Sequence, residues 1–133
     1  MLLNNFFIIS QLNTVGSEVN ATLAINSSHE IFNGHFPGKP VVPGVCMMQM
    51  VKEILENVTG NKIDLLQAQE MKFLAIIDPT ENHIIEANIK YKIVDDAGIN
   101  VTSTLFKDEL IHFKFKGYFS FRTRNEMNSN LVG

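Results

Sequence analysis

A histidine in a loop stiffened by glycine and proline is the residue of this chain best placed for chemistry. His35 opens the stretch His-Phe-Pro-Gly-Lys-Pro-Val-Val-Pro-Gly, which ends at Gly44 and leads directly into an apolar segment. Within that segment, Gln49 is the only polar side chain between Val45 and Val51. Histidine exchanges a proton near neutral pH, and free N–H groups at the start of a helix favour developing negative charge. Together these groups suit chemistry on a carbonyl compound.

The apolar segment after the loop predicts a helix over residues 44–58. The run is too long for a typical strand, Pro43 and Gly44 precede it, and Gly60 stands where a left-handed C-terminal cap belongs. Its first two turns are apolar nearly all round, so we expect this helix to be buried on most sides.

Most of the other segments alternate apolar and polar residues, which is typical of strands with one buried face. The predicted strands cover residues 6–12, 19–25, 63–77, 85–93, 99–105 and 111–121. Short turns join several of them, which favours antiparallel pairing. The sequence therefore predicts an α+β fold, in which an antiparallel sheet wraps around one long central helix. We expect one domain over residues 1–122 and a polar C-terminal tail over residues 123–133.

Composition excludes several classes of protein. The net charge is −3, too small to indicate a nucleic-acid partner, and no apolar run reaches the length of a membrane span. Cys46 is the only cysteine, which suits a reducing compartment and a buried, inert thiol. The first residues carry no positive charge, so we expect no signal peptide and a cytoplasmic location. No third ligand accompanies His29 and His35 at convincing spacing, so no metal site is expected.

The stretch Asn33-Gly-His-Phe-Pro-Gly-Lys-Pro-Val-Val-Pro-Gly-Val45 resembles the signature of bacterial β-hydroxyacyl-acyl-carrier-protein dehydratases, which have the hotdog fold. The segments Glu30–Phe32 and Met71–Pro79 match that family more loosely. The resemblance implies dehydration of 3-hydroxyacyl thioesters in fatty-acid or polyketide and polyene-type synthesis. The substrate would arrive on the phosphopantetheine of an acyl carrier protein, with no further cofactor. It also implies a homodimer or a dimer-built hexamer with sites at the dimer interface, or pairing with a second hotdog subunit.

Residue by residue, the resemblance assigns catalysis to His35, with the Gly44 N–H polarising the thioester carbonyl. At the position of Gln49 the family carries a carboxylate, Glu or Asp, that works with the histidine of the other subunit. Gln49 keeps the spacing of fourteen positions from His35 but neither ionises nor passes on a proton. Glu53, one helical turn further on, is an alternative source of the missing carboxylate. The substrate-binding residues expected around these groups are Phe36, Pro43, Val45, Met48 and Glu53.

The substitution at Gln49 leaves other functions open. One is a catalytically weak or inactive subunit that binds the carrier protein or its acyl chain, and another is a hotdog thioesterase. Met47, Met48 and Met50 suit core packing and the wall of an acyl tunnel equally well. A basic stretch of Lys114, Lys116, Arg122 and Arg124 is either a solvated strand face or a docking surface for an acidic carrier protein. His83 and His112 fall on polar strand positions, so we expect both to be exposed.

Overall fold

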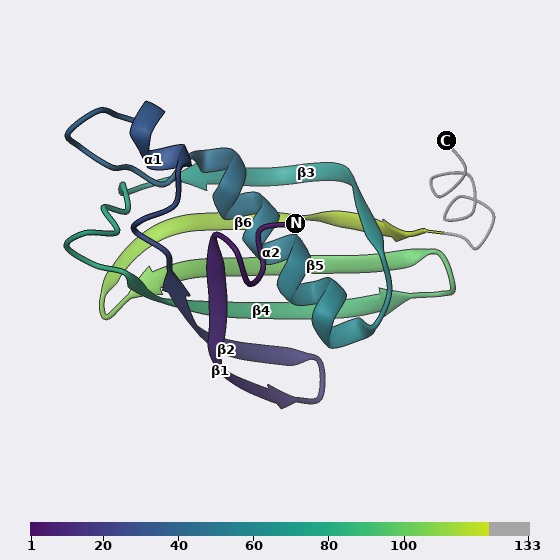
Figure 1. Ribbon diagram of the computed structural model, residues 1–133. Coiled ribbons are helices and arrows are strands. Elements are labelled where there is room, and N and C mark those ends of the chain that lie inside the picture. Colours follow the sequence, from purple (N-terminus) through teal and green to yellow (C-terminus); the bar gives the residue numbers. More distant parts are fainter. Residues whose placement is uncertain (123–133) are drawn as a thin grey trace.

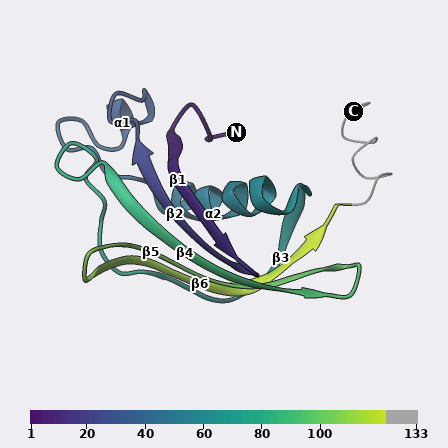
Figure 2. The same ribbon diagram turned by 90° about the horizontal axis from the view of Figure 1, so that it is seen from below.

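Six antiparallel strands curve around one long helix in the computed structural model, which describes residues 1–122 (Figure 1). The elements in chain order are β1 (Phe7–Val15), β2 (Glu18–Ile25), α1 (Ile31–Gly34), α2 (Gly44–Thr59), β3 (Ile63–Phe73), β4 (Ile84–Val94), β5 (Gly98–Lys107) and β6 (Leu110–Phe121). The strands lie in the order β1-β2-β4-β5-β6-β3. Figure 2 shows α2 on the concave face of the sheet, as the sequence pattern predicts. The expected tail, residues 123–133, lies outside the described residues.

Helix α2 begins and ends where the sequence signals stand. Gly60 adopts the left-handed conformation with φ 72°, and its N–H donates to the Glu56 carbonyl at 2.9 Å. A glycine adopts this backbone conformation without the steric cost that other residues incur. The buried face of α2 includes Met50, Ile54 and Leu55, which are fully buried. These side chains form one core with the apolar residues on the inner face of the sheet.

The start of α2 differs from the expectation that it is buried on most sides. Cys46 and Met47 are buried, but Val45 is 76% exposed and Met48 is half-buried. The sheet lies on one side of the helix, and the described chain leaves the other side of its first turn uncovered. No helix among residues 1–122 has the length and hydrophobicity needed to span a membrane.

The prediction that His112 is exposed is wrong, because β6 contains a register irregularity. Ile111 pairs with Phe106 and Phe113 pairs with Leu105, so His112 is an extra residue between two paired positions. Such a bulge changes the direction of the side chain. His112 is only 2% exposed, next to the fully buried Phe113. The prediction for His83, which is exposed, is confirmed.

Strand β3 is an edge strand with an apolar, solvent-facing surface. Among the described residues it pairs with β6 alone. Leu66 is 65% exposed and Phe73 51%, and Ile76, which follows the strand, is 59% exposed. The strand ends at Phe73 instead of continuing to residue 77 as predicted. Unpaired strand edges with exposed apolar side chains are typical places for pairing with another chain.

Candidate active site

The structure brings His35 and Gly44 to a single pocket. The pocket has a volume of about 350 Å³ and is formed by the histidine loop, the first turn of α2 and the chain that leaves β3. Its lining residues are His35, Val41, Val42, Gly44, Met47, Phe73, Leu74, Ala75 and Ile76. His35 and the Gly44 backbone are thus polar groups in a largely apolar environment, which is the usual composition of a small-molecule site.

The loop that carries His35 is held by its own backbone. The N–H of Phe36 donates to the Lys39 carbonyl and the N–H of Lys39 to the Phe36 carbonyl, both at 2.9 Å. The His35 ring stacks on Phe36 with 4.2 Å between centroids, and its Nδ1 lies 3.1 Å from the Val41 carbonyl oxygen. Because a carbonyl only accepts, Nδ1 carries the proton in this contact. In the neutral ring Nε2 then holds a lone pair and is available as a base.

The N-terminus of α2 provides hydrogen-bond donors at the same pocket. Pro43 precedes the helix with extended backbone, and its carbonyl accepts from the N–H groups of Cys46 and Met47 at 3.0 and 3.3 Å. The N–H of Gly44 precedes these and has no intrahelical acceptor. A side chain at Gly44 would bring its Cβ within 2.8 Å of Phe73 Cε1, so glycine is what permits this close packing.

His112 holds the opposite wall of the pocket, a role that the sequence analysis missed. The Leu74 N–H donates to the His112 carbonyl at 2.9 Å, and His112 Nδ1 donates to the Ala75 carbonyl at 3.2 Å. The Val42 N–H donates to the Ile77 carbonyl at 3.0 Å and joins this wall to the histidine loop. No sequence signal reveals this role, since it depends on the bulge in β6.

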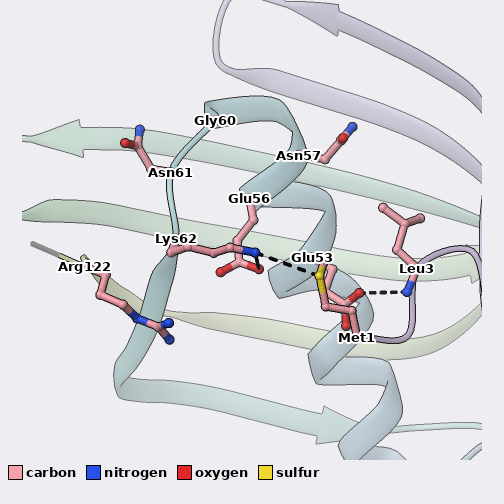
Figure 3. A pocket seen from close by; sticks show the side chains of 9 residues that line it. All are labelled: Met1, Leu3, Glu53, Glu56, Asn57, Gly60, Asn61, Lys62 and Arg122. Carbon is pink, nitrogen blue, oxygen red and sulfur yellow. Dashed lines mark hydrogen bonds and ion pairs between the residues drawn. The ribbon is translucent and has the colours of Figure 1, made fainter. Parts of the chain in front are cut away.

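Gln49 does not line the pocket of His35 in its own chain. Its Nε2 donates to Glu53 Oε2 at 2.8 Å. Glu53 is 1% exposed and also accepts from the backbone N–H groups of Leu2, at 2.9 Å, and Leu3, at 2.8 Å. Figure 3 shows Glu53 and Leu3 at a second pocket of about 400 Å³ beside the later turns of α2. An acid among apolar helix residues is the sequence signal for such a buried charge.

Four further residues predicted to bind substrate lie around the start of α2 but not in the lining of the His35 pocket. Phe36 and Val45 are exposed, whereas Pro43 and Met48 are half-buried. Their contact with substrate stays a prediction, as does that of Glu53. Met47, predicted as core and tunnel wall, is both buried and part of the pocket lining.

The predicted basic stretch divides into different environments. Lys114 and Lys116 are exposed on the outer face of β6. Arg122 forms an ion pair with Asp64 at 2.6 Å, and this hydrogen bond lowers the pKa of the Asp64 carboxyl. Arg124 lies outside the described residues. In the core, burial raises the pKa of the Cys46 thiol, in agreement with an inert cysteine.

The curved antiparallel sheet, its buried helix and the histidine loop are those of a hotdog protein of the dehydratase type. More particularly, the chain belongs to the ApeI-like family, whose model, described as ApeI dehydratase, matches residues 11–104. That match covers more than half of the chain.

Two curated relatives are described as 3-hydroxyacyl-[acyl-carrier-protein] dehydratase FabZ. The protein of Wolbachia pipientis is 28% identical over 82 residues, which are 56% of this chain and 57% of that protein. The protein of Klebsiella pneumoniae is 26% identical over 102 residues, 77% of this chain and 63% of that protein. The chain thus spans less than two thirds of the length of these relatives.

A solved structure confirms the hotdog fold. It is described as the dehydratase heterocomplex ApeI:P from Xenorhabdus doucetiae and superposes with a TM-score of 0.61 at 17% identity. The match covers 84% of this chain and 96% of the other.

Proposed function

We propose that the protein dehydrates 3-hydroxyacyl thioesters carried by an acyl carrier protein. The observation that carries this proposal is the shared pocket of His35, with Nε2 as the free base, and Gly44 at the start of α2. The relatives described as dehydratases of acyl-carrier-protein substrates support it. The phosphopantetheine belongs to the substrate, and the chain needs no cofactor of its own. The single cysteine supports a cytoplasmic location.

The reaction follows from the two groups in the pocket. Nε2 of His35 takes a proton from C2 of the acyl chain, and the electron pair moves onto the thioester oxygen. The Gly44 N–H and the dipole of α2 stabilise that negative charge. As the pair returns to form the C2–C3 double bond, the C3–O bond breaks. The leaving hydroxyl takes the proton from the His35 imidazolium and departs as water.

His35 performs both proton transfers in this scheme, because the residue at position 49 is a glutamine and not a carboxylic acid. An amide neither ionises nor gives up a proton at neutral pH. A separate general acid typically contributes about 10²–10⁴-fold in rate. We therefore expect a slow dehydratase, with Gln49 contributing a hydrogen bond to the substrate hydroxyl or to a water.

We propose that the complete site forms between two hotdog chains, with Gln49 of one chain facing His35 of the other. Two observations support the pairing: Gln49 is absent from the lining of its own chain's His35 pocket, and β3 has an exposed apolar edge. The second chain is a copy of this one, alone or in a dimer-built hexamer, or a different hotdog subunit. The solved structure described as the dehydratase heterocomplex ApeI:P from Xenorhabdus doucetiae supports a different subunit as partner. Native mass spectrometry at micromolar concentration tests the pairing, and a well-behaved monomer would contradict it.

A spectrophotometric assay of enoyl thioester formation from 3-hydroxyacyl-pantetheine tests the activity. We expect His35→Ala to reduce the rate by about 10²–10⁴-fold, as befits loss of the general base. His83→Ala is the matched control, because that histidine is exposed and outside the pocket. Activity that survives His35→Ala would refute the assignment of the base.

A second candidate is a subunit that binds acyl carrier protein without turnover, which the amide at Gln49 favours. The same assay separates the two functions. Binding of acyl-pantetheine to the purified protein, without turnover in the native chain or in Gln49→Glu, would support the binding subunit.

A further inference from the structure

Glu53 is a charged side chain in a place where charges are costly. It lies on the buried face of α2 with Ile54 and Leu55 as neighbours and is 1% exposed. A buried carboxylate needs hydrogen-bond donors to offset its lost hydration. Here the backbone N–H groups of Leu2 and Leu3 and the side-chain amide of Gln49 supply them.

The contact with Glu53 decides which way the Gln49 amide points. A carboxylate only accepts hydrogen bonds, so the NH₂ group must face Glu53 and the oxygen must lie on the opposite side of the amide carbon. The N–H groups of Leu2 and Leu3 donate to the two oxygens of the same carboxylate, so both oxygens act as acceptors in this arrangement. The orientation of Gln49 is therefore set by chemistry, and among residues 1–122 its oxygen accepts no hydrogen bond.

We propose that Glu53 is a positioning residue that holds the Gln49 amide with its oxygen toward the bound acyl chain, so that the site selects a 3-hydroxy over a 3-oxo group. This inference rests on the proposed function and deepens it. A hydroxyl at C3 donates to the amide oxygen. A ketone at C3 is only an acceptor, so it meets that oxygen without a hydrogen bond.

The selection has a physical magnitude. When a 3-oxoacyl compound binds, its C3 oxygen and the Gln49 amide oxygen are both acceptors. One hydrogen bond is then missing, and the lost hydration of these two oxygens is not offset. We expect the native protein to bind the 3-hydroxyacyl form about tenfold or more tightly than the 3-oxoacyl form. The site would then reject an oxo compound that has not yet been reduced to the alcohol.

Nuclear magnetic resonance tests the orientation without any assay of activity. In the native protein, one side-chain N–H of Gln49 should resonate downfield of those of exposed glutamines, because it is bound to a carboxylate. Glu53→Gln should remove this shift. Leu3 binds Oε1 whereas Leu2 and Gln49 both bind Oε2, so a neutral amide with one acceptor oxygen cannot serve all three donors, and Gln49 loses its carboxylate partner and its fixed orientation. Glu56→Gln is the control: Glu56 is on the same helix but accepts from Ile63 N–H instead.

An ordinary Gln49 resonance in the native protein would overturn the proposal, and this holds even if Glu53→Gln fails to fold. A shifted resonance that persists unchanged in folded Glu53→Gln would overturn it as well.

Calorimetry with non-hydrolysable pantetheine amides tests the selectivity. We expect the ratio of 3-hydroxyacyl to 3-oxoacyl affinity to fall about tenfold in Glu53→Gln and to stay unchanged in Glu56→Gln. An equal ratio in the native protein and in Glu53→Gln overturns the selectivity. If neither compound binds the native protein, the proposed function and the selectivity both fail, whereas the resonance of Gln49 still decides the positioning.

Discussion

Gln49→Glu should convert a slow dehydratase into a faster one. The change places a carboxyl group of nearly the same shape where Nε2 now lies 2.8 Å from Glu53 Oε2. Two full charges at that separation repel by about 6 kcal/mol at an effective dielectric constant of about 20. That energy corresponds to a factor of about 10⁴ in proton affinity, so the two groups share one proton at neutral pH.

The shared proton belongs mainly to position 49. Glu53 already receives two backbone N–H bonds, from Leu2 and Leu3, which the new carboxyl at position 49 lacks. The pKa of the new carboxyl is therefore raised, and the group is protonated near pH 7. It can then give its proton to the leaving hydroxyl, which the amide of Gln49 cannot do. We expect at least a tenfold gain, below the full range of about 10²–10⁴ for general acid catalysis.

Steady-state dehydration of 3-hydroxyacyl-pantetheine between pH 6 and 9 measures this gain. The rate of Gln49→Glu should fall as pH rises through the raised pKa, because the deprotonated form is no acid, and the native protein should lack that decline. Gln49→Met, which removes the amide without adding an acid, is the control. Activity in the native chain that Gln49→Glu leaves unchanged or lowers would show that glutamine is the working residue and would refute the reasoning.

Three further results are expected. Gly44→Ala would place a Cβ only 2.8 Å from Phe73 Cε1 and force that ring to move. We expect the free energy of unfolding, measured in urea, to fall by about 1 kcal/mol or more, and kcat/KM to fall as well. Adding Phe73→Leu should restore part of both. Asp64→Asn removes the ion pair with Arg122 and should cost less than about 1 kcal/mol at pH 7. The pKa of the Asp64 carboxyl is lowered in the folded state, so its contribution to stability is present above the ordinary value near 3.8 and disappears as the pH falls below it. In urea unfolding across pH 2–7, the free energies of unfolding of the native protein and of Asp64→Asn should therefore converge at the acid end. Cys46 should react with iodoacetamide much more slowly in the native protein than in urea, and equal rates would contradict its burial.

Local signals in the sequence were sufficient for most of the fold. Helix α2 depends on an apolar run between a proline-glycine start and a glycine end, and all three are properties of neighbouring residues. The strands follow from alternation, and the sheet's single apolar face requires the helix as cover. The pattern failed at His112 because a bulge inserts one residue into β6 without changing the alternation of residue types. It failed at Val45 because an apolar side chain does not reveal whether its own chain covers it.

The candidate site divides in the same way. His35 and Gly44 are nine positions apart in a rigid loop, so their common pocket follows from local geometry. The partners of Glu53 do not follow from local geometry. Leu2 and Leu3 contact it through their backbone N–H groups, which every residue except proline has, so the residue types do not reveal the contact. The sequence analysis treated Glu53 only as an alternative carboxylate for the site, although an acid among apolar helix residues is a signal for a buried group that needs hydrogen-bond partners.

The tie between Glu53 and the first residues has a consequence for the order in which the protein folds. Leu2 and Leu3 are separated from Glu53 by 51 and 50 positions in the sequence. The β4–β5 and β5–β6 hairpins, in contrast, form between strands that follow each other directly. Contacts across long loops cost more chain entropy and are made late. We expect the histidine loop and helix α2 to be in place before Leu2 and Leu3 dock. The Gln49 amide would then become oriented in the last step of folding. The pocket would therefore form before the protein can distinguish a 3-hydroxyacyl from a 3-oxoacyl group.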